Sequence, residues 1–108
     1  MLATANESNG RKLIVRNFPD RDLAFIKLLA QSLTRQCSNT VALLATTLEQ
    51  PALVFAQSLG LPFDMAMLMK ETMATLGGRG GGSKDMAQGG VPTAEGIEAV
   101  LSNVAALI

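Results

Sequence analysis

The chain of 108 residues contains no histidine, no tryptophan and no tyrosine, and its single cysteine is Cys37. Without histidine, a Ser-His-Asp triad, a Cys-His dyad and every histidine-ligated zinc site are excluded. A lone cysteine excludes a disulfide within the chain and suits a reducing compartment such as the cytoplasm. We therefore expect no catalytic residue, no metal site and no cofactor in this domain.

Net charge and long hydrophobic runs are also lacking. Nine basic and nine acidic residues give a formal net charge of zero, which argues against binding driven by overall charge but leaves a local basic patch open. No apolar run approaches the roughly 20 residues that span a bilayer. The first ten residues have neither the basic nor the apolar region of a secretory signal. We expect no membrane contact and a cytoplasmic location.

Hydrophobic residues make up 48% of the chain, enough for the core of one small domain. Residues 1–10 are polar and are interpreted as a flexible lead-in. Three β-branched or apolar runs predict strands over residues 11–18, 39–47 and 52–58. The first two flank a helix and should be parallel, whereas the short gap before the third favours an antiparallel hairpin. A fourth short strand near Asp85–Gly89 is an open alternative.

Three segments have the apolar periodicity of helices. The first follows Asp20, a candidate N-cap, and the second runs from Met65 to Leu76 between the cap Asp64 and the terminator Gly77. Pro92 and Thr93 open the third, and its apolar stripe consists of Ile97, Val100, Leu101, Val104 and Leu107. The sequence therefore predicts an α/β fold, with a small mixed β-sheet of three to five strands packed with about three helices.

A glycine-rich segment, LGGRGGGSKDMAQGG, lies between the last two helices at residues 76–90. It is no phosphate-binding P-loop, because a helix precedes it and Ser83-Lys84 reverses the Lys-Ser/Thr order. It lacks the dinucleotide motif too, since Ser83 stands where the third glycine belongs. Either the glycines serve tight turns and close packing, or they let main-chain N–H groups approach an anionic ligand.

The same segment resembles the GG-x-GGG-x-x-DMAQGG signature of the DHHA1 family. That family includes the C-terminal (C-Ala) domain of alanyl-tRNA synthetases and the equivalent domain of alanyl-tRNA editing proteins. The upstream helix PFDMAMLMKETMATLGG is also similar. The resemblance covers about residues 11–108, with the glycine-rich loop at 77–90, and implies a DHHA1-like fold. Ser83-Lys84 and Val91 depart from the residues that the family often has at those places.

The resemblance implies a tRNA-binding accessory domain used in protein biosynthesis, with tRNA-Ala as its partner and no activity of its own. It also implies that the chain is one domain taken from a longer enzyme, either an alanine-tRNA ligase or an aminoacyl-tRNA hydrolase that edits mischarged tRNA. Two alternatives stay open. One is the substrate-binding DHHA1 domain of a DHH-type phosphoesterase, although Ser83 replaces that branch's histidine. The other is a dimerisation module, which would make the protein a homodimer.

Candidate RNA contacts lie in the glycine segment and on the helix before it. Arg79 and Lys84 could pair with phosphates or point into water. Gln88 could reach a base or ribose, while Asp85 is expected to bind loop N–H groups and fix the loop's shape. Several of the glycines at 77–82 are expected to have a positive φ. The full candidate set is Arg79, Gly80, Gly81, Gly82, Ser83, Lys84, Asp85, Gln88 and, if its helix abuts the loop, Lys70.

Overall fold

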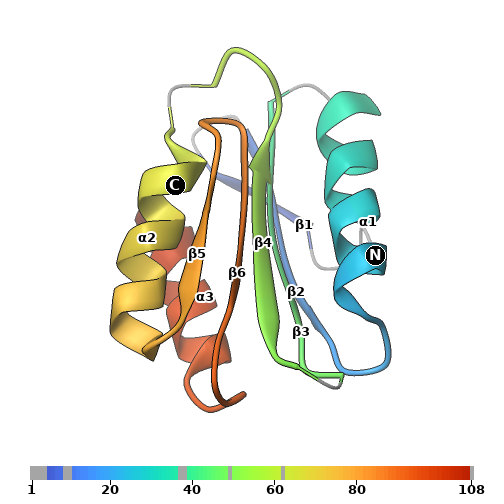
Figure 1. Ribbon diagram of the computed structural model, residues 1–108. Coiled ribbons are helices and arrows are strands. Elements are labelled where there is room, and N and C mark those ends of the chain that lie inside the picture. Colours follow the sequence, from blue (N-terminus) through green and yellow to red (C-terminus); the bar gives the residue numbers. More distant parts are fainter. Residues whose placement is uncertain (1–4, 9–10, 37–38, 49, 62, 108) are drawn as a thin grey trace.

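Six strands form one mixed sheet in the computed structural model, which describes residues 5–8, 11–36, 39–48, 50–61 and 63–107 (Figure 1). The strands are β1 (Ala5–Ser8), β2 (Arg11–Phe18), β3 (Thr40–Thr46), β4 (Ala52–Gln57), β5 (Arg79–Gly82) and β6 (Met86–Gly90). Their order across the sheet is β1-β2-β3-β4-β6-β5. Only β2 and β3 are parallel, and the other neighbours are antiparallel.

Helices cover both faces of this sheet. Helix α1 (Leu23–Gln36) lies on one face, and α2 (Met65–Leu76) and α3 (Ile97–Leu107) lie on the other (Figure 1). Because β3 and β4 are sandwiched between the two helical layers, every residue of both strands is buried. This double burial explains why their sequences are continuous apolar runs rather than alternating ones.

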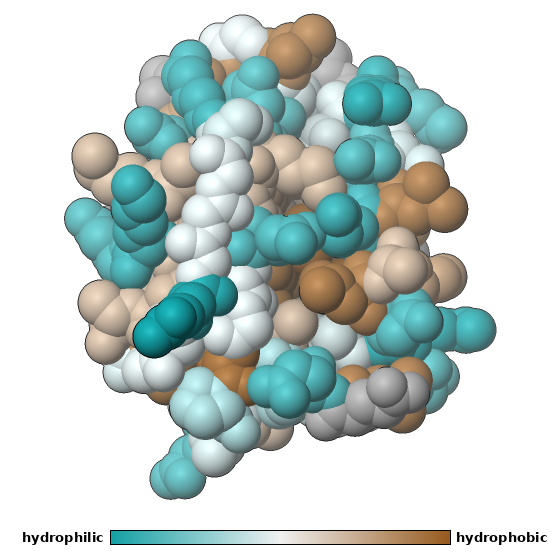
Figure 2. Space-filling view, in the orientation of Figure 1, coloured by the Kyte–Doolittle hydropathy of each residue, from teal (hydrophilic) through white to brown (hydrophobic). Residues whose placement is uncertain are grey.

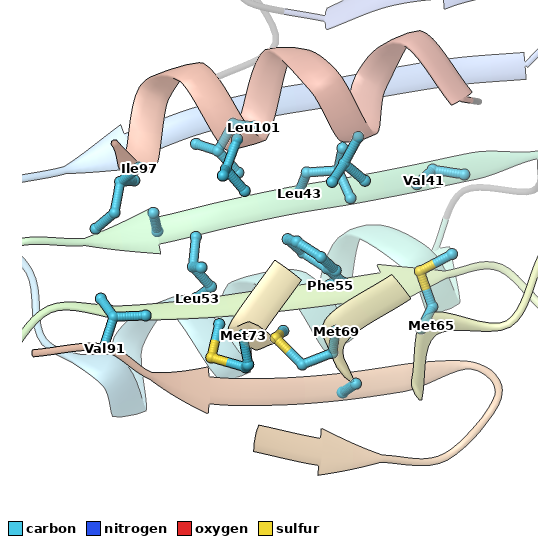
Figure 3. Packing of buried hydrophobic residues seen from close by; sticks show 14 of the residues in the cluster. Val41, Leu43, Leu53, Phe55, Met65, Met69, Met73, Val91, Ile97 and Leu101 are labelled. Atoms are coloured by element: carbon cyan, nitrogen blue, oxygen red, sulfur yellow. The ribbon is translucent and has the colours of Figure 1, made fainter. Parts of the chain in front are cut away.

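Two hydrophobic cores result, one on each face of the sheet. The core under α1 contains Ile14, Phe18, Ile26 and Leu44 among its members. The larger core lies between the sheet and the other two helices. Figure 3 shows its side chains converging from both sides, and the labelled ones are Val41, Leu43, Leu53, Phe55, Met65, Met69, Met73, Val91, Ile97 and Leu101. Leu68 is only half-buried at its edge.

The structure confirms the α/β class, the parallel β2–β3 pair, the β3–β4 hairpin and the bounds of α2. Asp64 caps α2 by accepting a hydrogen bond from Met67 N, and Gly77 ends it in the left-handed region at φ 74°. The sheet is wider than expected. Strand β6 confirms the alternative of a fourth strand near Asp85–Gly89. Strand β1 lies within the expected lead-in, and β5 lies within the expected loop at 77–90, where it pairs with β6.

Two helix starts were predicted wrongly. The N-cap of α1 is Asp22 rather than Asp20, since Asp22 Oδ1 accepts from Phe25 N at 2.9 Å. Helix α3 begins at Ile97, after Gly96 at φ 86°, rather than at Pro92 and Thr93. Cys37 falls outside the described residues, as does the side chain of Leu107. Among the described residues, no helix combines the length and the apolar character needed to cross a membrane.

Candidate functional site

The glycine segment folds into a hairpin at one edge of the sheet. In β5–β6, Gly81 lies opposite Gln88 and Gly82 lies opposite Ala87. Ser83 N donates to Met86 O at 2.8 Å and closes the turn. Since β6 also pairs with β4, the hairpin is a continuation of the sheet. The candidate residues are therefore held on regular strands and a short turn, not on a long loop.

Glycine is required at two positions of β5 because the strands approach closely. A Cβ at Gly80 would lie 2.5 Å from Gln88 O, and one at Gly82 would collide with Met86 O. Both obstacles are main-chain atoms, which cannot rotate away. Within 77–82, all of which the structure describes, only Gly77 has a left-handed φ. The expectation that several of these glycines have positive φ is therefore wrong, and the reason for them is steric.

Gly81 has no such steric reason. A Cβ built there meets no atom within 4 Å, and its φ lies outside the left-handed region. Glycine in a strand interior costs roughly 0.5–1 kcal/mol relative to alanine through conformational entropy. The fold thus carries a destabilising residue at a place where the structure leaves room for a side chain.

The buried amide of Gln57, at the end of β4, holds the hairpin turn in place. The two hydrogens of its Nε2 are shared among three acceptors: Phe63 O at 2.6 Å, Lys84 O at 3.1 Å and Asp85 Oδ1 at 3.1 Å. Its main-chain N donates to Asp85 O at 2.9 Å. The Asp85 carboxylate therefore accepts from a side chain of β4, which corrects the expectation that it fixes the turn through loop N–H groups.

Two adjoining hollows lie between α1 and the hairpin, and we call them together the trough. The smaller, of about 360 Å³, is lined by Lys27, Gln31, Gly81, Gly82, Met86, Ala87 and Gln88. The larger, of about 670 Å³, is lined by Gln31, Thr34, Arg35, Gln36, Gln57, Ser58, Leu59, Ser83, Asp85 and Met86. Gln31 and Met86 line both. Figure 2 shows this face of the molecule, on which β5 is the pale stripe. Both hydrophilic and hydrophobic side chains lie between β5 and α1.

Charge is unevenly distributed between the two helical layers. Helix α1 carries Lys27 and Arg35 and no acidic residue. The α2 and α3 segments, residues 64–76 and 92–107, contain four acidic residues against Lys70 alone, namely Asp64, Glu71, Glu95 and Glu98. Counted with its N-cap Asp22, α1 still has more basic than acidic residues, whereas the other layer is acidic; the trough itself also contains the carboxylate of Asp85. Within the described residues there is no group of three or more side chains suited to binding a metal ion.

The structure brings some of the candidate residues together and separates others. Gly81, Gly82, Ser83, Asp85 and Gln88 line the trough. Arg79, which opens β5, shares a face of that strand with Gly81 by alternation. The exposed Lys84 lies in the turn, where its carbonyl oxygen accepts from Met65 N at 2.8 Å.

Two candidates do not line the trough. The Cβ direction of Gly80 faces the β6 main chain. Lys70 is exposed on α2, in the layer on the other side of the sheet (Figure 1).

Sequence reasoning missed the α1 wall of the trough. Lys27, Gln31 and Arg35 recur every four residues and so share one side of the helix. That polar stripe can be recognised from the four-residue spacing in the sequence. Its significance depends on the strand order, because only the placement of β6 beside β4 puts the stripe opposite the glycine hairpin. Gln57 was missed for a different reason: a single glutamine in an apolar strand belongs to no sequence motif that would predict its role.

The sequence matches one protein family and several curated relatives. A family model described as the DHHA1 domain matches residues 10–108. An alanine–tRNA ligase of Granulibacter bethesdensis is 37% identical over 102 residues, which cover 91% of this chain and 12% of that protein. The alanyl-tRNA editing protein AlaX-L of Pyrococcus horikoshii is 30% identical over 82 residues, covering 76% of this chain and 20% of that protein.

A solved structure shares the fold. The C-Ala domain of alanyl-tRNA synthetase from Aquifex aeolicus superposes with a TM-score of 0.83, at 19% identity, over 93% of each chain. The mixed sheet with helices on both faces is therefore the C-Ala architecture. The chain spans only a small fraction of the length of the ligase and of the editing protein that it matches.

Proposed function

This chain belongs to the DHHA1 domain family, and from that membership and the trough we propose that it is a tRNA-binding accessory domain with no catalytic activity of its own. Its partner is tRNA, specifically tRNA-Ala. It serves a cytoplasmic alanine-tRNA ligase or alanyl-tRNA editing protein, in which it holds the substrate while other domains perform the chemistry. The names of the two matched relatives support this assignment.

The observation that carries the proposal is the composition of the trough. One wall is a helix whose only charged side chains are Lys27 and Arg35, and the facing strand pair presents the bare main chain of Gly81 beside the Gln88 amide. Cationic side chains and amides are the groups that contact phosphate and sugar in nucleic-acid complexes. The missing Cβ leaves space for a backbone of RNA to approach the strand.

The same layout limits the affinity. Lys27 and Arg35 lie in the trough walls, and Arg79 and Lys84 lie exposed on the hairpin. Each phosphate contact releases counterions and contributes about −0.9 to the slope of log K against log salt on duplex regions. With two to four such contacts, we expect binding of isolated tRNA in about the micromolar range, with a clear salt dependence.

The experiment compares two charge-removing variants. Lys27→Gln combined with Arg35→Gln should weaken binding of a tRNA-Ala transcript and flatten its salt slope by about one to two. Lys12→Gln combined with Lys70→Gln also removes two positive charges, from exposed residues that do not line the trough, and is the matched control, for which we expect little change. Equal loss in both variants would show that only overall charge matters. Unchanged affinity in the double variant would reject the trough as the RNA site.

A further inference from the structure

Two arginine side chains stack on two phenylalanine rings near the first turn of α1. The guanidinium carbon of Arg16 lies 5.0 Å from the centre of the Phe18 ring, and that of Arg21 lies 5.0 Å from the centre of the Phe25 ring. The two rings meet edge to face, with centroids 5.7 Å apart and planes at 68°. We call these four residues the Arg–Phe stack.

The stack is anchored at its centre and open at its ends. Phe18 is 6% exposed and belongs to the core under α1. Phe25 is 38% exposed, and both arginines are exposed. A guanidinium held over a ring loses less conformational freedom when a second flat group lies on its outer face. The neighbouring Asp22 carboxylate is engaged in capping α1.

The stack lies apart from the trough. Arg16 and Phe18 come from β2, whereas the trough is built against β6, and β3 and β4 separate these two strands in the sheet. Phe25 and Lys27, the nearest trough residue on α1, are two residues apart, which puts them about 3 Å apart along the helix axis and about 200° apart around it, on opposite sides of α1. The two surfaces therefore flank one helix at a separation that a single nucleic acid could cover.

We propose that the Arg–Phe stack is a second nucleic-acid contact, which takes unpaired bases by stacking. Guanidinium planes and aromatic faces are the groups on which proteins stack the bases of single strands and loops, and such stacking tolerates any sequence. Exposed guanidinium groups that lie over aromatic rings suit a planar ligand. This contact is independent of the trough, and it would persist if the trough bound nothing.

The test uses the complete chain and an octamer of adenylate, A8, with uridylate octamer U8 for comparison. Arg16→Lys combined with Arg21→Lys keeps both charges but removes the planar groups. We expect it to weaken A8 binding about fivefold or more without changing the salt slope, because stacking releases no counterions. Bound A8 should move the ring-proton resonances of Phe25 upfield, and U8 should bind more weakly because its ring is smaller.

Phe25→Leu supplies the second variant, with Met67→Leu, an exposed position on α2, as its control. We expect Phe25→Leu to weaken A8 binding while the control does not. Equal A8 affinity in the wild type and the lysine double variant would overturn the proposal, as would unmoved Phe25 resonances. A lowered melting temperature of Phe25→Leu with unchanged A8 binding would mean that the stack is structural only. Gly81→Val, which alters the trough, should leave the Phe25 shifts intact, so the two proposals can fail separately.

Discussion

Gly81 lies directly opposite Gln88 in the β5–β6 pair, and both residues line the same hollow beside α1. The Gln88 side chain supplies hydrogen-bonding groups there, whereas Gly81 supplies only main chain. Because a Cβ at Gly81 would meet open space, packing does not account for this glycine. Its neighbours Gly80 and Gly82 must be glycine because the β6 main chain lies too close for a Cβ. Adjacent glycines in this run are therefore present for different physical reasons.

That difference can be measured as stability. Gly80→Ala places a methyl group against the main chain of β6 and should lower the free energy of unfolding by about 1–3 kcal/mol, as overpacking does. Gly81→Ala meets no atom and reduces the freedom of the unfolded chain, so it should leave stability unchanged or raise it by up to about 1 kcal/mol. Urea unfolding of the two variants gives both values. Equal destabilisation would contradict the strand geometry described for β5.

The Gln57 amide should be essential to the turn that carries Ser83, Lys84 and Asp85. Gln57→Leu keeps much of the volume but removes the donor to Phe63 O, Lys84 O and Asp85 Oδ1. Lys84 O keeps its hydrogen bond from Met65 N, so the loss falls on Phe63 O and Asp85 Oδ1, which belong to half-buried residues. At about 0.5–1.5 kcal/mol for each hydrogen bond, we expect a loss of about 1–3 kcal/mol in thermal or chemical unfolding. Asp85→Asn retains an acceptor oxygen and is the matched control, with a smaller expected loss. A Gln57→Leu protein as stable as the wild type would refute this role.

The sequence was sufficient for the parts of the fold that depend on local signals. The cap Asp64 and the terminator Gly77 bound α2 correctly because an aspartate before an apolar stripe and a glycine after it act within one turn. The β-branched run from Arg11 to Phe18 gave β2 for the same reason. Asp20 and Asp22 are both suitable caps, and which one acts depends on where the chain leaves β2.

The hairpin could not be predicted with the same rules. Strand β5 consists of Arg79 and three glycines, which have low strand propensity and no alternation. It forms because β6 pairs with β4 and because α2 packs closely over both strands, with Met73 Sδ within 2.6 Å of where a Gly89 Cβ would lie. These are contacts between segments far apart in the chain. The trough depends on the same long-range contacts, so the sequence could not predict that α1 forms one of its walls.

The central claim is that Gly81 keeps the floor of the trough open for tRNA. The measurement that tests it most directly is the dissociation constant of a tRNA-Ala transcript for Gly81→Val, at a salt concentration where the wild type binds measurably. Gly90→Val is the control, because a Cβ there also meets nothing within 4 Å and Gly90 does not line the trough. We predict about tenfold or greater weakening for Gly81→Val, with its melting temperature preserved and the control close to wild type. Wild-type affinity in a folded Gly81→Val protein would contradict the claim.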